Sequence, residues 1–157
     1  MTMNKGKQFE EQFKKDFIKS FPNSFILRLP DQMSGYKSFS QNPCDFIAYT
    51  NGILFMIECK SHKGASAPFD VITQYDKLKS YQNITGVRVG VIVWLYEKDL
   101  VFYVPVKTIE QMKKEGKKSV GIKAIQEGYD IIEIPSEKKR VLMTSDYSVL
   151  LNLQEGE

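Results

Sequence analysis

The chain has 157 residues, of which 42% are hydrophobic and 26% charged, and this length and composition fit a globular domain with a buried core. The net charge of +3 is compatible with a nucleic-acid partner but does not require one. No apolar run reaches the roughly 18 residues of a membrane helix, and the N-terminus has no secretion-signal pattern, so we expect a soluble cytoplasmic protein with no membrane partner.

The first predicted element is an amphipathic helix over residues 5–20. Three phenylalanines recur there at helical spacing, with charged residues between them: Phe9, Phe13 and Phe17. Glu10 and Glu11 lie beside this aromatic stripe, and either one could reach the edge of the buried face. A glutamate exposed to solvent is the simpler alternative for both.

A short strand is predicted over residues 25–29, and Pro30 ends it. The polar segment 30–43 follows as a loop that leads directly into Asp45. Long loops without secondary structure are often functional, and this one carries side chains able to contact a DNA backbone, among them Lys37 and Gln41.

The strongest local signal is the Asn51-Gly52 dipeptide between two apolar, β-rich runs, which predicts a hairpin with a two-residue type I′ turn. Such a turn also determines the register of the two strands. Counting outward gives the pairs Thr50–Ile53, Tyr49–Leu54, Ile47–Met56 and Asp45–Glu58.

This register places Asp45 and Glu58 opposite each other, where like charges are destabilising unless something positive lies between them. Lys60 is two residues beyond Glu58, so strand alternation places it on the same face. Two carboxylates supply the oxygen ligands that Mg²⁺ prefers, and a lysine can hold or deprotonate an attacking water. The pattern therefore favours metal-assisted phosphodiester hydrolysis over a salt-bridged surface hairpin.

The chain has two cysteines, Cys44 and Cys59, and the same register places them opposite each other on the face away from the acids. In a reducing compartment they are most simply buried thiols, and a cross-strand disulfide is the alternative. With His62 as the single histidine, they do not make a structural zinc site.

After Lys60 we predict a mobile turn over 61–68 and a helix over about 69–82. Strands are predicted over 87–96 and 100–104, and a short basic helix over 107–115. Weaker extended segments and a docking C-terminal element follow. This order indicates an α/β fold with a mixed sheet flanked by helices, forming one domain over residues 1–153 with a disordered tail over 154–157.

The residues Asn42-Pro43-Cys44-Asp45 and Ile57-Glu58-Cys59-Lys60 resemble the motif of the PD-(D/E)xK nuclease superfamily, with a cysteine between the proline and the aspartate. Further details are similar to RecU-type Holliday junction resolvases. They are Gly6-Lys7-Gln8-Phe9-Glu10, Ser66-Ala67-Pro68-Phe69, Thr73-Gln74-Tyr75 and Lys117-Lys118-Ser119. The resemblance covers mainly residues 44–118 and the first helix.

This resemblance implies a restriction-endonuclease-like fold and a homodimer that uses Mg²⁺ or Mn²⁺ to nick four-way DNA junctions, leaving 5′-phosphates and 3′-hydroxyls. It selects Glu10, rather than Glu11, as a third acid beside Asp45 and Glu58, and it adds Gln74 to the catalytic group. Its metal ligands would be Asp45, Glu58, Glu10 and the main-chain carbonyl of Cys59. RecU proteins carry a long stalk ahead of the catalytic aspartate, whereas this chain has only the segment 30–43.

Several basic and polar residues are candidates for DNA contact: Lys37, Gln41, His62, Lys63, Lys117 and Lys118. A second basic group is Lys138-Lys139-Arg140, for which a solvated turn is an equal alternative. Two other functions stay open. They are a restriction- or repair-type nuclease acting on duplex DNA or DNA ends, and a non-catalytic DNA-binding module with the same fold.

Overall fold

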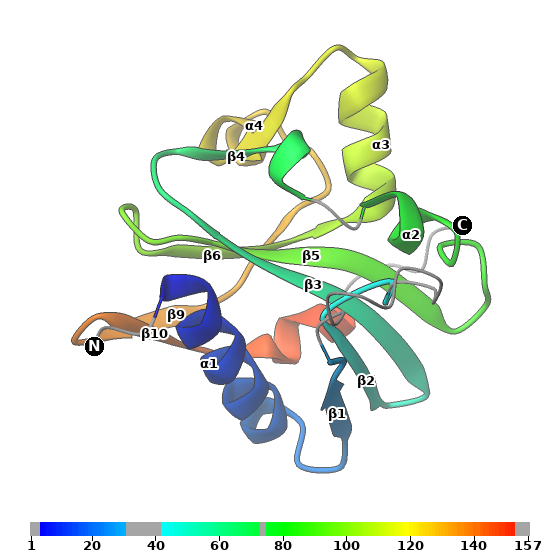
Figure 1. Ribbon diagram of the computed structural model, residues 1–157, viewed down its shortest axis with the longest axis vertical. Helices are drawn as coiled ribbons and strands as arrows, with labels where there is room; N and C mark the ends of the chain where they lie inside the picture. The colour runs from blue at the N-terminus through cyan, green and yellow to red at the C-terminus, as the bar shows by residue number, and fades with distance from the viewer. Residues whose placement is uncertain (1–3, 31–41, 73–74, 153–157) are drawn as a thin grey trace, which may run out of the picture.

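The computed structural model describes residues 4–30, 42–72 and 75–152. Its centre is a six-stranded mixed sheet in the order β1-β2-β3-β5-β6-β8 (Figure 1). The strands are β1 (Phe25–Arg28), β2 (Phe46–Thr50), β3 (Ile53–His62), β5 (Val87–Leu95), β6 (Leu100–Pro105) and β8 (Ile132–Glu133). Strands β3 and β5 are parallel, and the other neighbouring pairs of this sheet are antiparallel. The predicted mixed α/β fold is confirmed.

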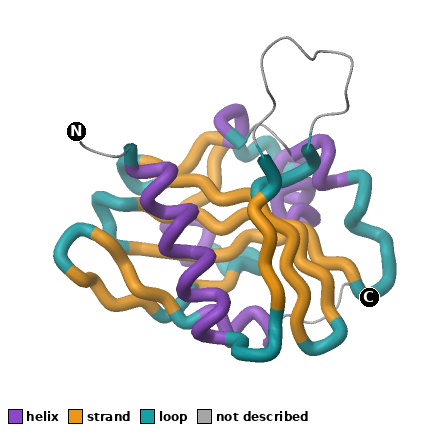
Figure 2. Tube along the Cα trace, turned by 60° about the horizontal axis from the view of Figure 1, so that its bottom comes forward, coloured by secondary structure: helices purple, strands orange, loops and turns teal. Residues whose placement is uncertain are grey.

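Helices cover both faces of the sheet, as Figures 1 and 2 show. The helical elements are α1 (Lys5–Ser20), η1 (Phe69–Val71), α2 (Tyr75–Lys79), α3 (Val106–Lys114), α4 (Ile122–Gln126) and η2 (Tyr147–Asn152). Two small antiparallel sheets complete the fold: β4 (Ser66–Pro68) with β7 (Ser119–Gly121), and β9 (Ser136–Lys139) with β10 (Leu142–Ser145). Among the described residues, no helix is both long and apolar enough to cross a membrane.

Helix α1 covers one face of the sheet and has the bounds predicted from its aromatic spacing. It begins after Asn4, whose side-chain oxygen accepts a hydrogen bond from the Lys7 N–H at 2.8 Å and so caps the helix. Its buried Phe13 packs against Phe46 of β2 and Tyr147 of η2, with ring centroids 5.1 and 5.0 Å away. This aromatic core attaches the helix firmly to the sheet.

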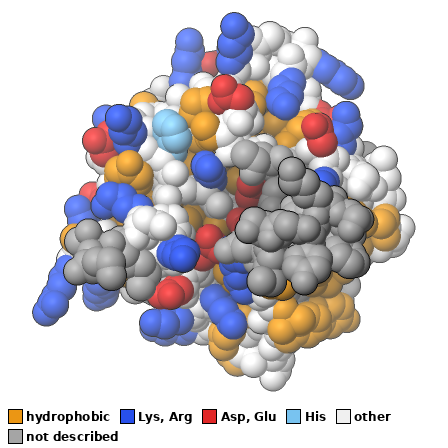
Figure 3. Space-filling view, in the orientation of Figure 1, with side chains coloured by type: hydrophobic (Ala, Val, Ile, Leu, Met, Phe, Trp, Pro, Cys, Tyr) orange, Lys and Arg blue, Asp and Glu red, His pale blue; other side chains and the backbone are white. Residues whose placement is uncertain are grey.

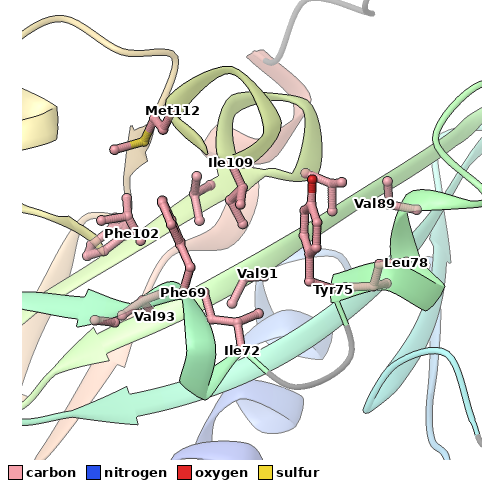
Figure 4. Close-up of a cluster of buried hydrophobic side chains, with 14 of the residues drawn as sticks. Phe69, Ile72, Tyr75, Leu78, Val89, Val91, Val93, Phe102, Ile109 and Met112 are labelled. Atoms are coloured by element: carbon pink, nitrogen blue, oxygen red, sulfur yellow. The ribbon is translucent and has the colours of Figure 1, made fainter. Parts of the chain in front are cut away.

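The opposite face is covered by η1, α2, α3 and α4, which enclose a second core. Figure 4 shows the side chains of Phe69 and Ile109 meeting over the valines of β5. Strand β5 is buried on both sides because it lies in the middle of the sheet, which explains its nearly continuous apolar sequence.

The β2–β3 hairpin has the predicted turn, and its register is as predicted for the pairs Thr50–Ile53, Tyr49–Leu54 and Ile47–Met56, whereas the predicted Asp45–Glu58 pair is not part of the ladder. Asn51 and Gly52 have φ angles of 53° and 77°, as a type I′ turn requires. The ladder runs from the Thr50–Ile53 pair to the Phe46–Ile57 pair. Strand β3 then continues to His62, beyond the start of β2, so its last residues extend past the end of this hairpin.

Two predictions for the segment after Lys60 are wrong. Residues 61–68 are not a mobile turn, since β3 continues through His62 beside β5, and β4 pairs with β7. The predicted helix over 69–82 is reduced to the turn η1 and the short helix α2. Pairing with distant strands, which the local pattern does not reveal, determines this segment. The predicted tail over 154–157 lies outside the described residues.

Candidate active site

The candidate site lies where β3 continues past the start of β2. Asp45, the residue just before β2, donates its backbone N–H to the Ile57 carbonyl at 3.1 Å and accepts the Leu29 N–H at its own carbonyl at 2.8 Å. Its main chain is therefore tied to both β1 and β3. This double attachment positions the Asp45 side chain at the edge of β3.

The carboxylate of Asp45 turns toward β3. Its Oδ2 accepts the backbone N–H of Cys59 at 2.9 Å. Backbone groups alternate along a strand, so the Cys59 carbonyl points to the same edge as the Ile57 carbonyl, two residues earlier. A side-chain oxygen and a main-chain oxygen are thus directed to one region.

Glu58 and Lys60 lie on β3 on either side of Cys59. Glu58 is only 4% exposed, which is unusual for a glutamate and requires compensation by charge or hydrogen bonds. Lys60 is partly exposed and shares the face of Glu58. A buried acid next to a half-exposed lysine is an arrangement suited to proton transfer near a bound substrate.

Glu10 of α1 is held by an arginine that the sequence analysis did not select. The Oε1 atom of Glu10 accepts a hydrogen bond from Nε of Arg28 at 2.8 Å and forms an ion pair with Nη2 at 2.6 Å. The Arg28 Nη1 also donates to the carbonyl of Leu29, the residue whose N–H binds the Asp45 carbonyl. One guanidinium therefore links the acid on α1 to the end of β1 and, through Leu29, to Asp45.

The pKa of the Cys59 thiol depends on the charged side chains around it. Burial raises its pKa well above 9.0, and the negative charges of Asp45, Glu10 and Glu58 raise it further, in that order, while Arg28 opposes them. The three acids proposed from the sequence thus act together on one atom. Figure 3 shows acidic and basic side chains next to each other near the middle of the view.

The prediction that Cys44 lies opposite Cys59, away from the acids, is wrong. Cys44 packs beside Met56 in the core under α2 and α3, whereas Cys59 packs on the α1 side of the sheet. The regular β2–β3 ladder ends at Phe46, so strand alternation does not extend to Cys44. Both cysteines are free.

The oxygen atoms gathered at this site suit a cation that binds few protein ligands. Within residues 4–30, 42–72 and 75–152, no three His, Cys, Asp or Glu side chains form a ready-made metal site. Mg²⁺ is commonly held by one or two carboxylates, with waters and substrate phosphates completing its shell. Asp45, the buried Glu58 and the Cys59 carbonyl fit this pattern, while the Glu10 carboxylate is engaged by Arg28.

The remaining candidates lie in different places. Nδ1 of His62 donates to the Lys63 carbonyl at 2.6 Å at the end of β3, and Lys63 is exposed. On the β4–β7 side, Lys117 forms an ion pair with Glu127 at 3.2 Å, and Lys118 is exposed. The candidates Gln74, Lys37 and Gln41 lie outside the described residues.

Comparison with protein families gives a match to the model "Recombination protein U" over residues 32–144. The matched region contains Asp45, Glu58, Lys60 and Arg140, and it covers most of the chain. The chain belongs to the RecU family. Among curated proteins, none matches this RecU-family chain.

A solved structure supports the fold of this RecU-family protein. The Holliday junction resolvase Hjc of Archaeoglobus fulgidus is 19% identical, with a TM-score of 0.56. The match covers 79% of the present chain and 94% of Hjc. The restriction-endonuclease-like fold predicted from the sequence motif is therefore confirmed.

Arg28 is the residue of this RecU-family site that sequence reasoning missed. The available signal was a single charge in the apolar run Phe25-Ile26-Leu27-Arg28-Leu29. Its role depends on the contact between β1 and α1, which brings together residues that are distant in sequence. No local pattern specifies that contact.

Proposed function

We propose that this protein is a metal-dependent Holliday junction resolvase, an endonuclease that hydrolyses DNA phosphodiesters to a 5′-phosphate and a 3′-hydroxyl. The observation that carries the proposal is the position of Asp45 and Glu58 at the edge of β3, with Lys60 on the face of Glu58. Membership of the RecU family and the likeness to Hjc support it.

Mg²⁺ or Mn²⁺ would be held by Asp45, Glu58 and the Cys59 carbonyl, with Glu10 close by. When bound, the cation would stabilise the negative charge that develops on the cleaved phosphate. Glu58 is suited to this role because a buried carboxylate favours a cation over water as its partner. The Cys59 N–H orients Asp45 by binding the Oδ2 atom.

The other residues have positioning and proton-transfer roles. Lys60 would orient or deprotonate the attacking water, because its ammonium lies on the face of Glu58 and remains accessible. Arg28 holds the carboxylate of Glu10, and Gln74 remains a candidate on sequence grounds.

The proposed partners are four-way DNA junctions and a second copy of the chain. Two copies are needed because paired nicks require two active sites. The molar mass of the protein in solution tests whether it is a dimer.

The deciding experiment uses a labelled synthetic four-way junction and a linear duplex of matched sequence, each with Mg²⁺, Mn²⁺ or EDTA. Symmetrical nicks in the junction alone, dependent on metal and absent with the Asp45→Asn protein, are the expected result. Absence of cleavage of either substrate by folded protein would contradict the proposal and favour a DNA-binding module.

A second function is favoured by one departure from the family. Only the segment 30–43 occupies the place where RecU proteins carry their stalk. A nuclease lacking that element could act on ordinary duplex or on DNA ends. Equal cleavage of junction and duplex in the same assay would identify this restriction- or repair-type activity.

A further inference from the structure

The β9–β10 hairpin lies outside the six-stranded sheet and is not used by the candidate active site. Its base is firmly attached to the protein. Met143 is 7% exposed in the core beneath α1, and the Ser145 N–H donates to Oδ2 of Asp16 in α1 at 2.9 Å. The hairpin is therefore a rigid projection, not a loose loop. Figures 1 and 2 show it beside α1.

The tip of this hairpin carries three consecutive basic residues followed by an exposed aliphatic one: Lys138, Lys139, Arg140 and Val141. Val141 is 66% exposed, the highest value among the large hydrophobic side chains of the described residues. In Figure 3, basic side chains are seen along the left edge of the molecule, where the hairpin projects. The tip contributes nothing to either core, so packing does not explain its composition.

Arg140 occupies a turn position that favours glycine or asparagine. Its φ of 59° lies in the left-handed region, which is unfavourable for a side chain of this kind. Strained residues of this type are found preferentially where function requires them. At this position the turn presents a long cationic side chain to solvent.

The positive charges at the tip are available to a ligand. Lys138 pairs with Asp99 at 3.4 Å and Lys139 with Glu137 at 3.2 Å, but these lysine side chains are 52% and 60% exposed. Exposed pairs of this kind contribute little and are easily exchanged for other anions. Arg140 has no ion pair with any described residue.

A row of cations beside an aliphatic side chain suits a ligand that alternates phosphates with apolar sugar and base surfaces. We propose that the β9–β10 tip binds duplex DNA as a second contact, separate from the candidate active site. Lys138, Lys139 and Arg140 contact backbone phosphates of one arm of the substrate, and Val141 packs against a sugar. The proposal rests on the proposed function for the identity of the ligand.

The attachment to α1 explains how this contact would serve cleavage. Asp16, which binds the hairpin, and Glu10, which is held by Arg28, belong to the same helix. A DNA arm bound by the tip would therefore be fixed relative to the acids beside β3. Contacts with the backbone position the substrate without reading its sequence.

The test is binding of a four-way junction and of a linear duplex in EDTA over a range of salt concentrations. The variant carries Lys138→Ala, Lys139→Ala and Arg140→Ala, and its control carries Lys107→Ala, Lys114→Ala and Lys123→Ala, which remove equal charge from exposed positions of α3 and α4. The hairpin variant should bind about tenfold or more weakly, and the slope of log affinity against log salt should fall by about 2 to 3. The control should bind like wild type.

A second variant, Val141→Ser, separates the apolar contact from the charges. It should weaken binding without changing the salt slope, and circular dichroism should show each variant folded. Wild-type affinity and salt slope in the hairpin variant would overturn the proposal, as would an equal loss in the control. Because binding is measured without metal, the result stands apart from cleavage: a wild-type protein that binds but never cuts refutes the proposed function alone.

Discussion

The guanidinium of Arg28 holds the carboxylate of Glu10 through two donors on one oxygen, with Nη2 at 2.6 Å and Nε at 2.8 Å from Oε1. The two side chains are 31% and 19% exposed, so water only partly screens this pair. The contact joins α1 to the end of β1, beside the residue that binds the Asp45 main chain. It therefore sets the position of Glu10, the third candidate acid.

The Arg28→Gln variant should cleave about tenfold or more slowly, because Glu10 loses the group that orients it. The Mn²⁺ concentration needed for half-maximal cleavage should not rise. The substitution removes a positive charge beside three carboxylates, and that charge would repel a cation. Cleavage rates over a Mn²⁺ titration measure both quantities. The Arg28→Lys variant should recover only part of the rate, because an ammonium cannot reproduce the guanidinium fork.

The control for this prediction is a double-mutant cycle with Glu10→Gln. If Arg28 acts through Glu10, adding Arg28→Gln to the Glu10→Gln protein should cost little further activity. Additive losses, or a loss of activity that only follows a lower melting temperature, would assign Arg28 a purely structural role.

Asp45→Asn and Glu58→Gln should each abolish cleavage while DNA binding in EDTA stays equal or becomes stronger. Each substitution would remove a proposed metal ligand together with a negative charge near the proposed position of the substrate phosphates. Gel assays of cleavage and fluorescence anisotropy of a labelled junction provide the two readouts. Parallel loss of binding and cleavage in folded protein would argue against the metal-ligand assignment.

Lys60→Ala should slow cleavage by about 100-fold or more at saturating DNA and metal, if Lys60 orients or activates the water. Binding of metal and of DNA should change much less. Single-turnover rates across pH provide the measurement, with Lys63→Ala as the control, since Lys63 is exposed beyond the end of β3. A comparable loss in both variants would point to general electrostatics.

The centre of the site was predictable because it is encoded locally. Asn51-Gly52 selects the turn, the turn sets the register, and the register places Asp45 near Glu58. The same counting failed at the outer end of the hairpin, where neither the predicted Asp45–Glu58 pair nor the Cys44–Cys59 pair belongs to the ladder. It assumed that the ladder continues to Cys44, whereas the Asp45 N–H bonds to the Ile57 carbonyl and the chain leaves the sheet.

Features that depend on contacts between distant segments were not predictable. Arg28 acts on Glu10 only because β1 and α1 are packed together. The segment after His62 carries a weak local preference, and its pairing with β7 overrides the expected loop. Asp16 was not selected either, since one aspartate in an amphipathic helix gives no sign that it will be buried.

The arrangement of the two cysteines leads to a direct prediction. Cys44 and Cys59 lie on opposite faces of the sheet, so no disulfide should form between them. Titration with a thiol reagent should count two free thiols in denaturant. In the native protein Cys44 should react very slowly, because it is 1% exposed. Finding no free thiols in denatured, unreduced monomer would contradict this arrangement.

The buried carboxylate of Asp16 is expected to stabilise the fold, not to take part in cleavage. Its Oδ2 accepts the Ser145 N–H and its Oδ1 accepts Nε2 of Gln12, both at 2.9 Å. Asp16→Ala should lower the free energy of unfolding by about 1 to 3 kcal/mol, because the Ser145 N–H loses its partner. Urea unfolding measures this, and Lys14→Ala on the exposed side of α1 is the matched control.

The contribution of Asp16 to the free energy of unfolding should decrease as the pH rises. Burial raises the pKa of Asp16 above its usual 3.8, outweighing the hydrogen bonds that lower it, so the folded protein favours the protonated acid. The resulting stabilisation is complete below the unfolded-state pKa and is lost as pH rises through the folded-state pKa. Relative to Asp16→Asn, which cannot ionise, wild type should therefore lose stability as pH rises across the acid range. An opposite trend, measured by urea unfolding of both proteins at several pH values, would show that the hydrogen bonds to Asp16 outweigh its burial.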